Sequence, residues 1–89
     1  VESLMRSEAE AWGGTGVTSN TLVPGFVLTP LNARLQEDAE KIAALAERTM
    51  IGRNGLPSDF AGAAVFLAGA GSAYVTGHSL FVDSGMSAH

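Results

Sequence analysis

Apolar residues recur every three or four positions over the first twelve residues of the chain, and this spacing predicts a helix over 1–12. Because the periodicity starts at the first residue with no capping side chain before it, we expect the sequence to start inside an element. The charged residues fall mostly outside the apolar face, which comprises Val1, Leu4, Met5, Ala9 and Trp12.

The segment Gly13–Gly16 ends this helix, and the β-branched residues of Val17–Val23 predict a strand that Pro24 and Gly25 close. A glycine cluster can also bind phosphate, but a dinucleotide-binding loop needs a strand before its glycines and a helix after them. In this chain the helix comes first. We therefore interpret the glycines as a helix end and a turn.

Thr29 and Pro30 predict the start of a second helix, because a threonine hydroxyl can cap it and proline at the first helical position needs no hydrogen-bond partner. We expect this helix to run to Met50 and to be amphipathic, with Glu37 and Lys41 forming a favourable surface pair. Its apolar stripe comprises Leu31, Leu35, Ala39, Ile42, Ala46 and Met50.

A third helix is predicted after the loop 52–57, with Ser58 as its cap and Asp59 in its first turn, near the positive end of the helix dipole. The residues Phe60–Ala68 are apolar on nearly all sides, which predicts a helix buried on more than one side. The last expected element is a strand over His78–Val82 that ends at 83–85.

The order helix-strand-helix-helix-strand predicts the α/β class, with a parallel crossover between the two strands. A parallel sheet needs helices on both faces and further strands at its edges, whereas two strands alone are marginal in water. The sequence therefore predicts a part of a larger parallel sheet, incomplete on its own.

The composition narrows the possible partners. Nine acidic and five dispersed basic residues give a formal net charge of −4, so no basic stripe is present that would bind a nucleic acid backbone. The absence of cysteine excludes disulfides and thiolate metal sites. No apolar run is long enough to cross a membrane and no secretory leader is present, so a cytoplasmic location is expected.

The residues alone make 23–30 a candidate binding site, because this segment runs from the carboxyl end of a strand into a helix start. Free backbone groups after Pro24 and Gly25, together with the Thr29 hydroxyl, could hold a planar amide or a phosphate. A plain turn and helix cap explains the same residues equally well.

Other reactive side chains favour structural roles. His78, Ser79 and Asp83 are crowded on one short strand, where adjacent side chains point to opposite faces, so a nucleophilic triad is rejected. His78 and His89 have no carboxylates at metal-ligand spacing, and no metal site is expected.

Four linked motifs, PGFVLTP, GRNGLPSD, AVFLA and YVTGHSLFVDSGM, resemble the C-terminal third of the short-chain dehydrogenases/reductases. The resemblance extends over essentially all 89 residues. It implies that 1–89 are the C-terminal part of a single Rossmann-like, doubly wound domain whose complete form binds NAD or NADP and acts on a small alcohol or ketone. Gluconate 5-dehydrogenase-like, polyol or 3-oxoacyl reductases are the implied subclass. One departure is Ser84, which stands where many relatives have glycine.

The resemblance also implies a role for each segment. It implies that Pro24, Gly25, Val27 and Thr29 contact the cofactor. The helix after Thr29 corresponds to the mobile substrate lid. Residues 1–12 correspond to the end of the helix that begins at the catalytic tyrosine and lysine. The family's glycine-rich cofactor loop, catalytic serine and Tyr-x-x-x-Lys pair have no counterpart here. This chain alone is therefore not expected to bind the cofactor or to transfer hydride.

Two hypotheses remain. In the first, the chain belongs to an NAD(P)-dependent oxidoreductase and contributes the nicotinamide-side loop, the substrate lid and the oligomer surface. In the second, it is a non-catalytic α/β module that associates with itself. This module would associate through its exposed strand edges and helix stripes. A chain this short cannot cover its own apolar surface, and the resemblance implies that the corresponding helix and last strand pack against a second subunit. We therefore expect a homo-oligomer formed through the Phe60–Ala68 helix and the Ser79–Asp83 strand, with Phe66, Leu80 and Phe81 at its centre.

Overall fold

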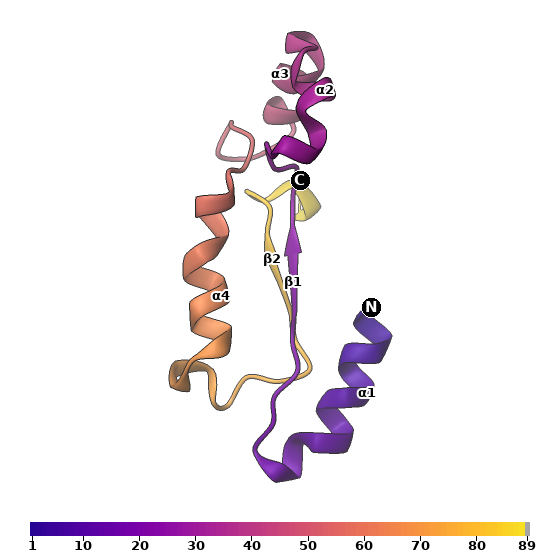
Figure 1. Cartoon of the computed structure of the whole chain (residues 1–89), viewed down its shortest axis with the longest axis vertical. Helices are drawn as coiled ribbons and strands as arrows, with labels where there is room; N and C mark the ends of the chain where they lie inside the picture. The colour runs from indigo at the N-terminus through magenta and orange to yellow at the C-terminus, as the bar shows by residue number, and fades with distance from the viewer. Residues whose placement is uncertain (89) are drawn as a thin grey trace. The chain divides into compact units, whose positions relative to one another are not determined.

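The chain divides into two compact units (Figure 1). The computed structural model describes residues 1–88, apart from the side chain of Leu31. The first unit contains 1–23 and 61–80, and the second contains 24–60 and the residues from Phe81 onward. No helix within the described residues is long and apolar enough to cross a membrane.

In the first unit, helix α1 spans Glu2–Trp12, which confirms the predicted N-terminal helix. It runs into a short 3₁₀ turn, after which Gly16 adopts a left-handed φ of 86°. The glycines thus form a helix end, as expected. Met5 and Ala9 are buried, whereas Leu4 and Trp12 are exposed. The described chain therefore covers only part of the apolar face of α1.

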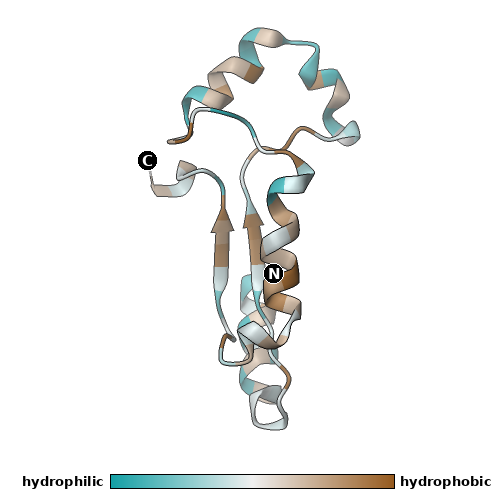
Figure 2. Cartoon of the chain, turned by 90° about the vertical axis from the view of Figure 1, so that its left-hand side faces the viewer, coloured by the Kyte–Doolittle hydropathy of each residue, from teal (hydrophilic) through white to brown (hydrophobic). Residues whose placement is uncertain are grey.

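Strands β1, Thr21–Pro24, and β2, Ser79–Val82, form a two-stranded sheet. The Thr21 N–H donates to the His78 C=O at 2.9 Å, and four residues further along both strands the Gly25 N–H donates to the Val82 C=O at 3.2 Å. The two arrows in Figure 2 point the same way. The sheet is therefore parallel, as predicted, and the chain has the α/β architecture of a Rossmann-like fragment.

The strand predicted over Val17–Val23 begins later than expected. Ser19 and Asn20 bind the segment before β2 through side chains as well as backbone: the Ser19 N–H donates to Thr76 Oγ1 at 3.1 Å, and Asn20 Nδ2 donates to the Val75 C=O at 3.0 Å. These side-chain bonds replace the regular ladder, which explains why the strand prediction was wrong for these residues.

Helix α4, Ala61–Ala68, lies on the opposite side of the strand pair from α1 (Figure 1). Both faces of the pair thus carry a helix, as in a doubly wound sheet. The prediction that this apolar helix is buried on more than one side was wrong for the chain as described, since Val65 is 72% and Phe66 46% exposed. The hydropathy colouring of Figure 2 marks the residues of this helix as largely hydrophobic.

The single helix predicted over 29–50 is broken in the structure. A 3₁₀ turn, Pro30–Asn32, leads into α2, Ala33–Gln36, and a separate helix α3 spans Ala39–Glu47. Asp38 causes the break: its backbone is extended, and its carboxylate accepts the Lys41 N–H at 3.1 Å as the cap of α3.

The break changes the expected helix surface. Glu37 lies before the cap of α3, and the described residues contain no ion pair between it and Lys41. The apolar stripe is covered unevenly, because Leu35, Ile42 and Ala46 are half-buried while Ala39 and Met50 are exposed. The side chain of Leu31, also predicted in the stripe, lies outside the described residues.

The turn after β2 closes the second unit. Ser84 has a φ of 56°, which is left-handed and disfavoured for a residue with a Cβ. Its Oγ accepts the Ile51 N–H at 2.9 Å, and its C=O accepts the Met50 N–H at 2.7 Å. Gly85 follows with a φ of 79°, and a Cβ there would lie 2.5 Å from Met50 Sδ. The serine thus holds the 50–51 segment at the cost of a strained backbone.

Two substitutions of Ser84 separate strain from hydrogen bonding. Ser84→Ala keeps the strained backbone and loses the bond to Ile51, so the free energy of unfolding should fall by about 0.5–1.5 kcal/mol. Ser84→Gly loses the same bond but relieves roughly 1 kcal/mol of strain, so the two effects should nearly cancel. Urea denaturation measures both, with the exposed Ser58→Ala as control. Equal losses in both Ser84 variants would contradict the strain.

Candidate functional site

The loop that follows β1 carries all four residues predicted to bind a cofactor. Pro24 is exposed at the end of the strand, while Gly25, Val27 and Thr29 are half-buried. A Cβ at position 25 would lie 3.0 Å from both Cα and Cβ of Asp83, which is tighter than nine in ten real Cβ contacts, so any other residue there would force Asp83 to shift. The structure therefore brings the predicted residues together in one extended segment of the second unit.

One edge of this loop pairs with the residues before Pro57. Val27 and Gly55 form an isolated parallel bridge, in which the Gly55 N–H donates to the Phe26 C=O and the Leu28 N–H to the Gly55 C=O, both at 2.9 Å. Backbone groups alternate in direction along an extended chain, so the N–H and C=O of Val27 face away from Gly55. Of these two groups on the free edge, the Val27 N–H has no hydrogen-bond partner among the described residues, whereas the C=O accepts a bond from a side chain.

The Val27 C=O and the Thr29 N–H are held by a single side chain. Asn32 Nδ2 donates to the Val27 C=O at 2.6 Å, and Asn32 Oδ1 accepts the Thr29 N–H at 3.0 Å. Thr29 occupies the cap position of the 3₁₀ turn with an extended backbone, as predicted from the Thr-Pro pair. Sequence reasoning missed Asn32, although an amide three residues after a capping threonine is a recognisable capping signal.

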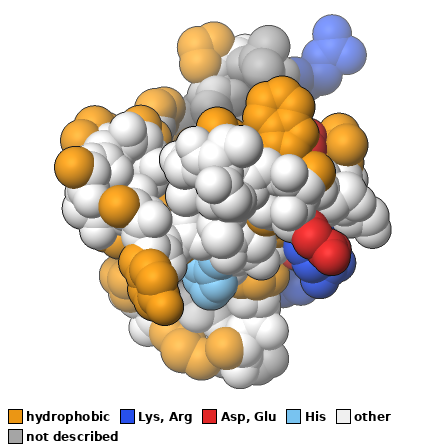
Figure 3. All heavy atoms as spheres, turned by 90° about the horizontal axis from the view of Figure 1, so that it is seen from below, with side chains coloured by type: hydrophobic (Ala, Val, Ile, Leu, Met, Phe, Trp, Pro, Cys, Tyr) orange, Lys and Arg blue, Asp and Glu red, His pale blue; other side chains and the backbone are white. Residues whose placement is uncertain are grey.

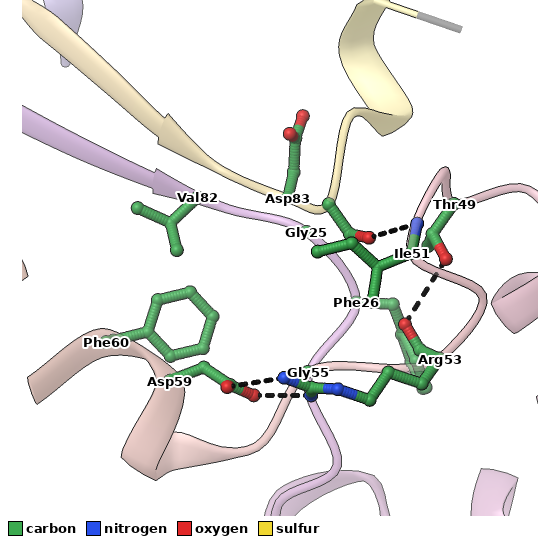
Figure 4. A pocket seen from close by; sticks show the side chains of 11 residues that line it. Gly25, Phe26, Thr49, Ile51, Arg53, Gly55, Asp59, Phe60, Val82 and Asp83 are labelled. Carbon is green, nitrogen blue, oxygen red and sulfur yellow. Dashed lines mark hydrogen bonds and ion pairs between the residues drawn. The ribbon is translucent and has the colours of Figure 1, made fainter.

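A cavity of about 130 Å³ lies on the other side of the loop (Figure 4). Its lining includes Phe26, Phe60 and Val82, and of the four predicted cofactor residues it includes only Gly25. Pockets for drug-sized ligands measure roughly 300–1,000 Å³, so this cavity is too small for a dinucleotide. The candidate binding surface is therefore the free edge of the loop and not this cavity.

A bidentate ion pair closes one wall of the cavity (Figure 4). Arg53 Nη1 and Nη2 each lie 2.8 Å from an oxygen of Asp59, and Asp59 Oδ2 also accepts the Leu56 N–H at 2.7 Å. The hydrogen bonds from Arg53 and then from Leu56 hold the pKa of the Asp59 carboxyl well below its usual range. The same pair raises the pKa of the Arg53 guanidinium.

The ion pair corrects the expected start of the third helix. The chain enters α4 through a 3₁₀ turn, Pro57–Phe60, in which Asp59 is the acidic residue of the first turn, as predicted. Its contacts are with Arg53 and with the N–H of Leu56, the residue before the turn, and among the described residues the Ser58 side chain makes no capping hydrogen bond, so the predicted Ser58 cap was wrong. The sequence contained a signal for this pair, namely opposite charges on either side of the loop 54–58.

The remaining candidates have structural contacts. Asp83 Oδ1 and Oδ2 accept the N–H groups of Gly85 and Ser87, and the hydrogen bonds from Ser87 and Gly85 lower the pKa of its carboxyl. His78 lies just before β2, where its N–H donates to Asn20 Oδ1. Among residues 1–88 no cluster of His, Asp or Glu could hold a metal ion, and His89 lies outside the described residues.

The sequence model of a family described as enoyl-(acyl carrier protein) reductase matches residues 1–87. The chain belongs to this family of short-chain dehydrogenases/reductases. The affiliation predicted from the four sequence motifs is thereby confirmed.

Individual relatives agree with the family. The chain is 48% identical to an L-rhamnose 1-dehydrogenase (NAD(P)(+)) of Sphingomonas sp., over 97% of the chain and 34% of that protein. It superposes with a TM-score of 0.93 and 39% identity on a gluconate 5-dehydrogenase from Burkholderia cenocepacia in complex with NADP and tartrate, over 99% of the chain and 34% of that protein.

An oxidoreductase of the short-chain dehydrogenase/reductase family from Burkholderia thailandensis gives a TM-score of 0.91 at 32% identity, over 99% of the chain and 35% of that protein. The chain thus spans about a third of the length of the relatives it matches. These relatives use NAD(P), and NADP is bound in solved structures among them.

The Arg53–Asp59 pair makes stability depend on acid pH. Because folding lowers the pKa of Asp59, the ionised carboxylate stabilises the protein above the ordinary carboxyl pKa of about 4, and this contribution is lost as the pH falls below that value. Asp59→Asn should therefore have a lower Tm than the unmodified protein at pH 7. Between pH 5 and pH 2.5 the Tm of Asp59→Asn should fall by less than the Tm of the unmodified protein. Glu47→Gln, an exposed charge change, serves as control. Parallel Tm-against-pH curves for Asp59→Asn and the unmodified protein would refute this role.

Proposed function

We propose that this chain is the C-terminal segment of an NAD(P)-dependent short-chain oxidoreductase, in which it supplies the nicotinamide-side loop, the substrate lid and part of the oligomer surface. The observation that carries the proposal is the free edge of the loop 24–29. It follows the carboxyl end of a parallel strand, where ligands of open α/β sheets bind.

The order of elements supports a C-terminal placement. The first segment of a dinucleotide-binding fold runs from a strand through glycines into a helix. In this chain the glycines follow helix α1 and precede strand β1. Tyr74 has His78 at the fourth position after it, and Lys41 has Glu37 at the fourth position before it, so neither belongs to a Tyr-x-x-x-Lys pair.

The loop fits a nicotinamide carboxamide. The Val27 N–H can donate to the amide oxygen, the Val27 C=O has a second lone pair beside its bond from Asn32, and Thr29 offers a hydroxyl. Bound NAD(P) would supply the hydride chemistry itself. The contribution of this chain is to orient the amide, and hence the ring to which it is attached.

The segment from Pro30 to Glu47 is proposed as the lid over a small alcohol or ketone. Its helices are short, and none of their described side chains is fully buried, so they are held by few contacts. The relatives include dehydrogenases of L-rhamnose and galactitol and a gluconate 5-dehydrogenase, which favours a sugar, polyol or sugar acid as substrate. We place the enzyme in the cytoplasm as part of the same proposal.

Exposed apolar side chains support self-association. On α4 and β2 these include Val65, Phe66 and Phe81, which are 72%, 46% and 50% exposed. Hydrophobic side chains are also exposed on the face of the molecule shown in Figure 3. A homo-oligomer would bury them, and so would a non-catalytic self-associating module, which is the second candidate function.

Thr29→Val in the complete enzyme tests the cofactor loop. Loss of one hydroxyl contact should weaken NAD(P)H binding by about 0.5–1.5 kcal/mol and leave Tm nearly unchanged. Titration calorimetry measures the dissociation constant, with the exposed Thr18→Val as the matched control. An unchanged dissociation constant would show that Thr29 only caps the following turn. A complete protein that binds no NAD(P)H would favour the non-catalytic module.

Phe81→Glu tests self-association. A charge placed in an apolar contact has to be desolvated, so the substitution should dissociate the oligomer of the complete protein at micromolar concentration. Sedimentation velocity measures the change, and Tyr74→Glu is a control at a side chain that is fully exposed in this chain. A cooperatively folded, monodisperse monomer before any substitution would rule out the predicted homo-oligomer.

A further inference from the structure

Two amide side chains from the start of the proposed lid hold the backbone of the cofactor loop. Asn32 Nδ2 donates to the Val27 C=O at 2.6 Å and Asn32 Oδ1 accepts the Thr29 N–H at 3.0 Å. Gln36 Nε2 donates to the Thr29 C=O at 2.8 Å and to Asn32 Oδ1 at 2.5 Å. Three backbone groups of 27–29 are thus fixed by side chains that lie four residues apart.

We infer that Asn32, supported by Gln36, is a positioning residue for the nicotinamide end of the cofactor. This inference rests on the proposed function of the loop and deepens it. Asn32 does not need to touch the cofactor. It acts through Val27, because the plane of the peptide that contains the Val27 C=O sets the path of the backbone from Val27 to Thr29 and hence the direction of the groups offered to the amide.

Among the described residues, only the side chains of Asn32 and Gln36 hydrogen-bond to this side of the loop. Its opposite edge is held by the two bonds with Gly55, and the ladder ends at Leu28. Without the Asn32 side chain, the Thr29 N–H would lose its hydrogen-bond partner, and Val27 would be restrained from one side only. The half-buried position of Asn32 partly shields its bonds from water, which makes them more effective than bonds at an exposed site.

The amide of Asn32 is chemically specific. Its oxygen accepts two hydrogen bonds and its nitrogen donates one, so donor and acceptor are both in use. Aspartate at this position would keep an acceptor for the Thr29 N–H but would place a second oxygen against the Val27 C=O. Leucine would keep the approximate volume and remove both functions.

The chain contains a matched control for such a clamp. Asn20 Nδ2 donates to the Val75 C=O at 3.0 Å, and Asn20 Oδ1 accepts the His78 N–H at 3.1 Å. Like Asn32, it is half-buried and holds one C=O and one N–H of a neighbouring segment. It precedes β1, whereas the cofactor loop follows β1, so its loss removes the same kind of bonds without reaching the loop.

The test compares two ligands on the complete enzyme. NADH or NADPH carries the nicotinamide, and ADP-ribose or 2′-phospho-ADP-ribose lacks it. Asn32→Leu and Asn32→Asp should each raise the dissociation constant of the reduced cofactor by about three- to tenfold and change that of the nicotinamide-free ligand by less than about twofold. Asn20→Leu should lower Tm and leave both dissociation constants unchanged.

Each outcome has one consequence. A selective loss of cofactor binding in the Asn32 variants supports the inference. If Asn32→Leu does not fold, the measurement on Asn32→Asp alone decides. Equal losses for both ligands, or no loss in a folded Asn32 variant, overturn it while the proposed function stands. If the unmodified enzyme binds the nicotinamide-free ligand as tightly as the cofactor, and Thr29→Val changes neither, the proposed role of the loop fails instead.

Discussion

The Gly25 N–H donates to the Val82 C=O where two parallel strands end together, and the candidate site depends on this pairing. Because the strands are parallel, the loop after β1 and the turn after β2 leave the sheet at the same edge. They approach so closely there that a Cβ on Gly25 would lie 3.0 Å from Asp83. Val27 and Thr29 are carried to the edge where open α/β sheets bind ligands.

Periodicity and turn residues were sufficient to predict the main elements. The helix over 1–12 follows from its 3.6-residue spacing. The parallel strand pair and the helix through Ala61–Ala68 follow from β-branched and apolar runs bounded by glycine and proline positions. The break at Asp38 was missed because the apolar stripe continues across it, and periodicity does not record that a short carboxylate side chain caps α3 better than it continues a helix.

The backbone segment of the candidate site could be predicted from the sequence, but the side chains that hydrogen-bond to it could not. The Pro24–Gly25 turn and the Thr29–Pro30 helix start lie close together in the sequence. Asn32 acts back on Val27, and Arg53 reaches Asp59 across a loop, so both contacts depend on how the chain turns between the partners. The exposure of α4 was mispredicted for another reason: apolar residues indicate that a surface is buried, but not whether the same chain buries it.

The proposed division of labour follows from what this third of a short-chain dehydrogenase/reductase contains. It has groups that can orient a planar amide, and it has no Tyr-x-x-x-Lys pair to exchange a proton with substrate. Within this third, Asn32 and Gln36 link the proposed cofactor loop to the proposed lid by hydrogen bonds. The residues proposed to orient the nicotinamide are hydrogen-bonded to side chains in the first turns of the element proposed to cover the substrate.

The most direct test is a crystal structure of the complete enzyme with NAD(P)⁺ bound. The account predicts the carboxamide oxygen about 3 Å from the backbone nitrogen of Val27, with Asn32 still bonded to the Thr29 N–H. A carboxamide held by other residues, with 24–29 making no contact to the nicotinamide, would contradict it.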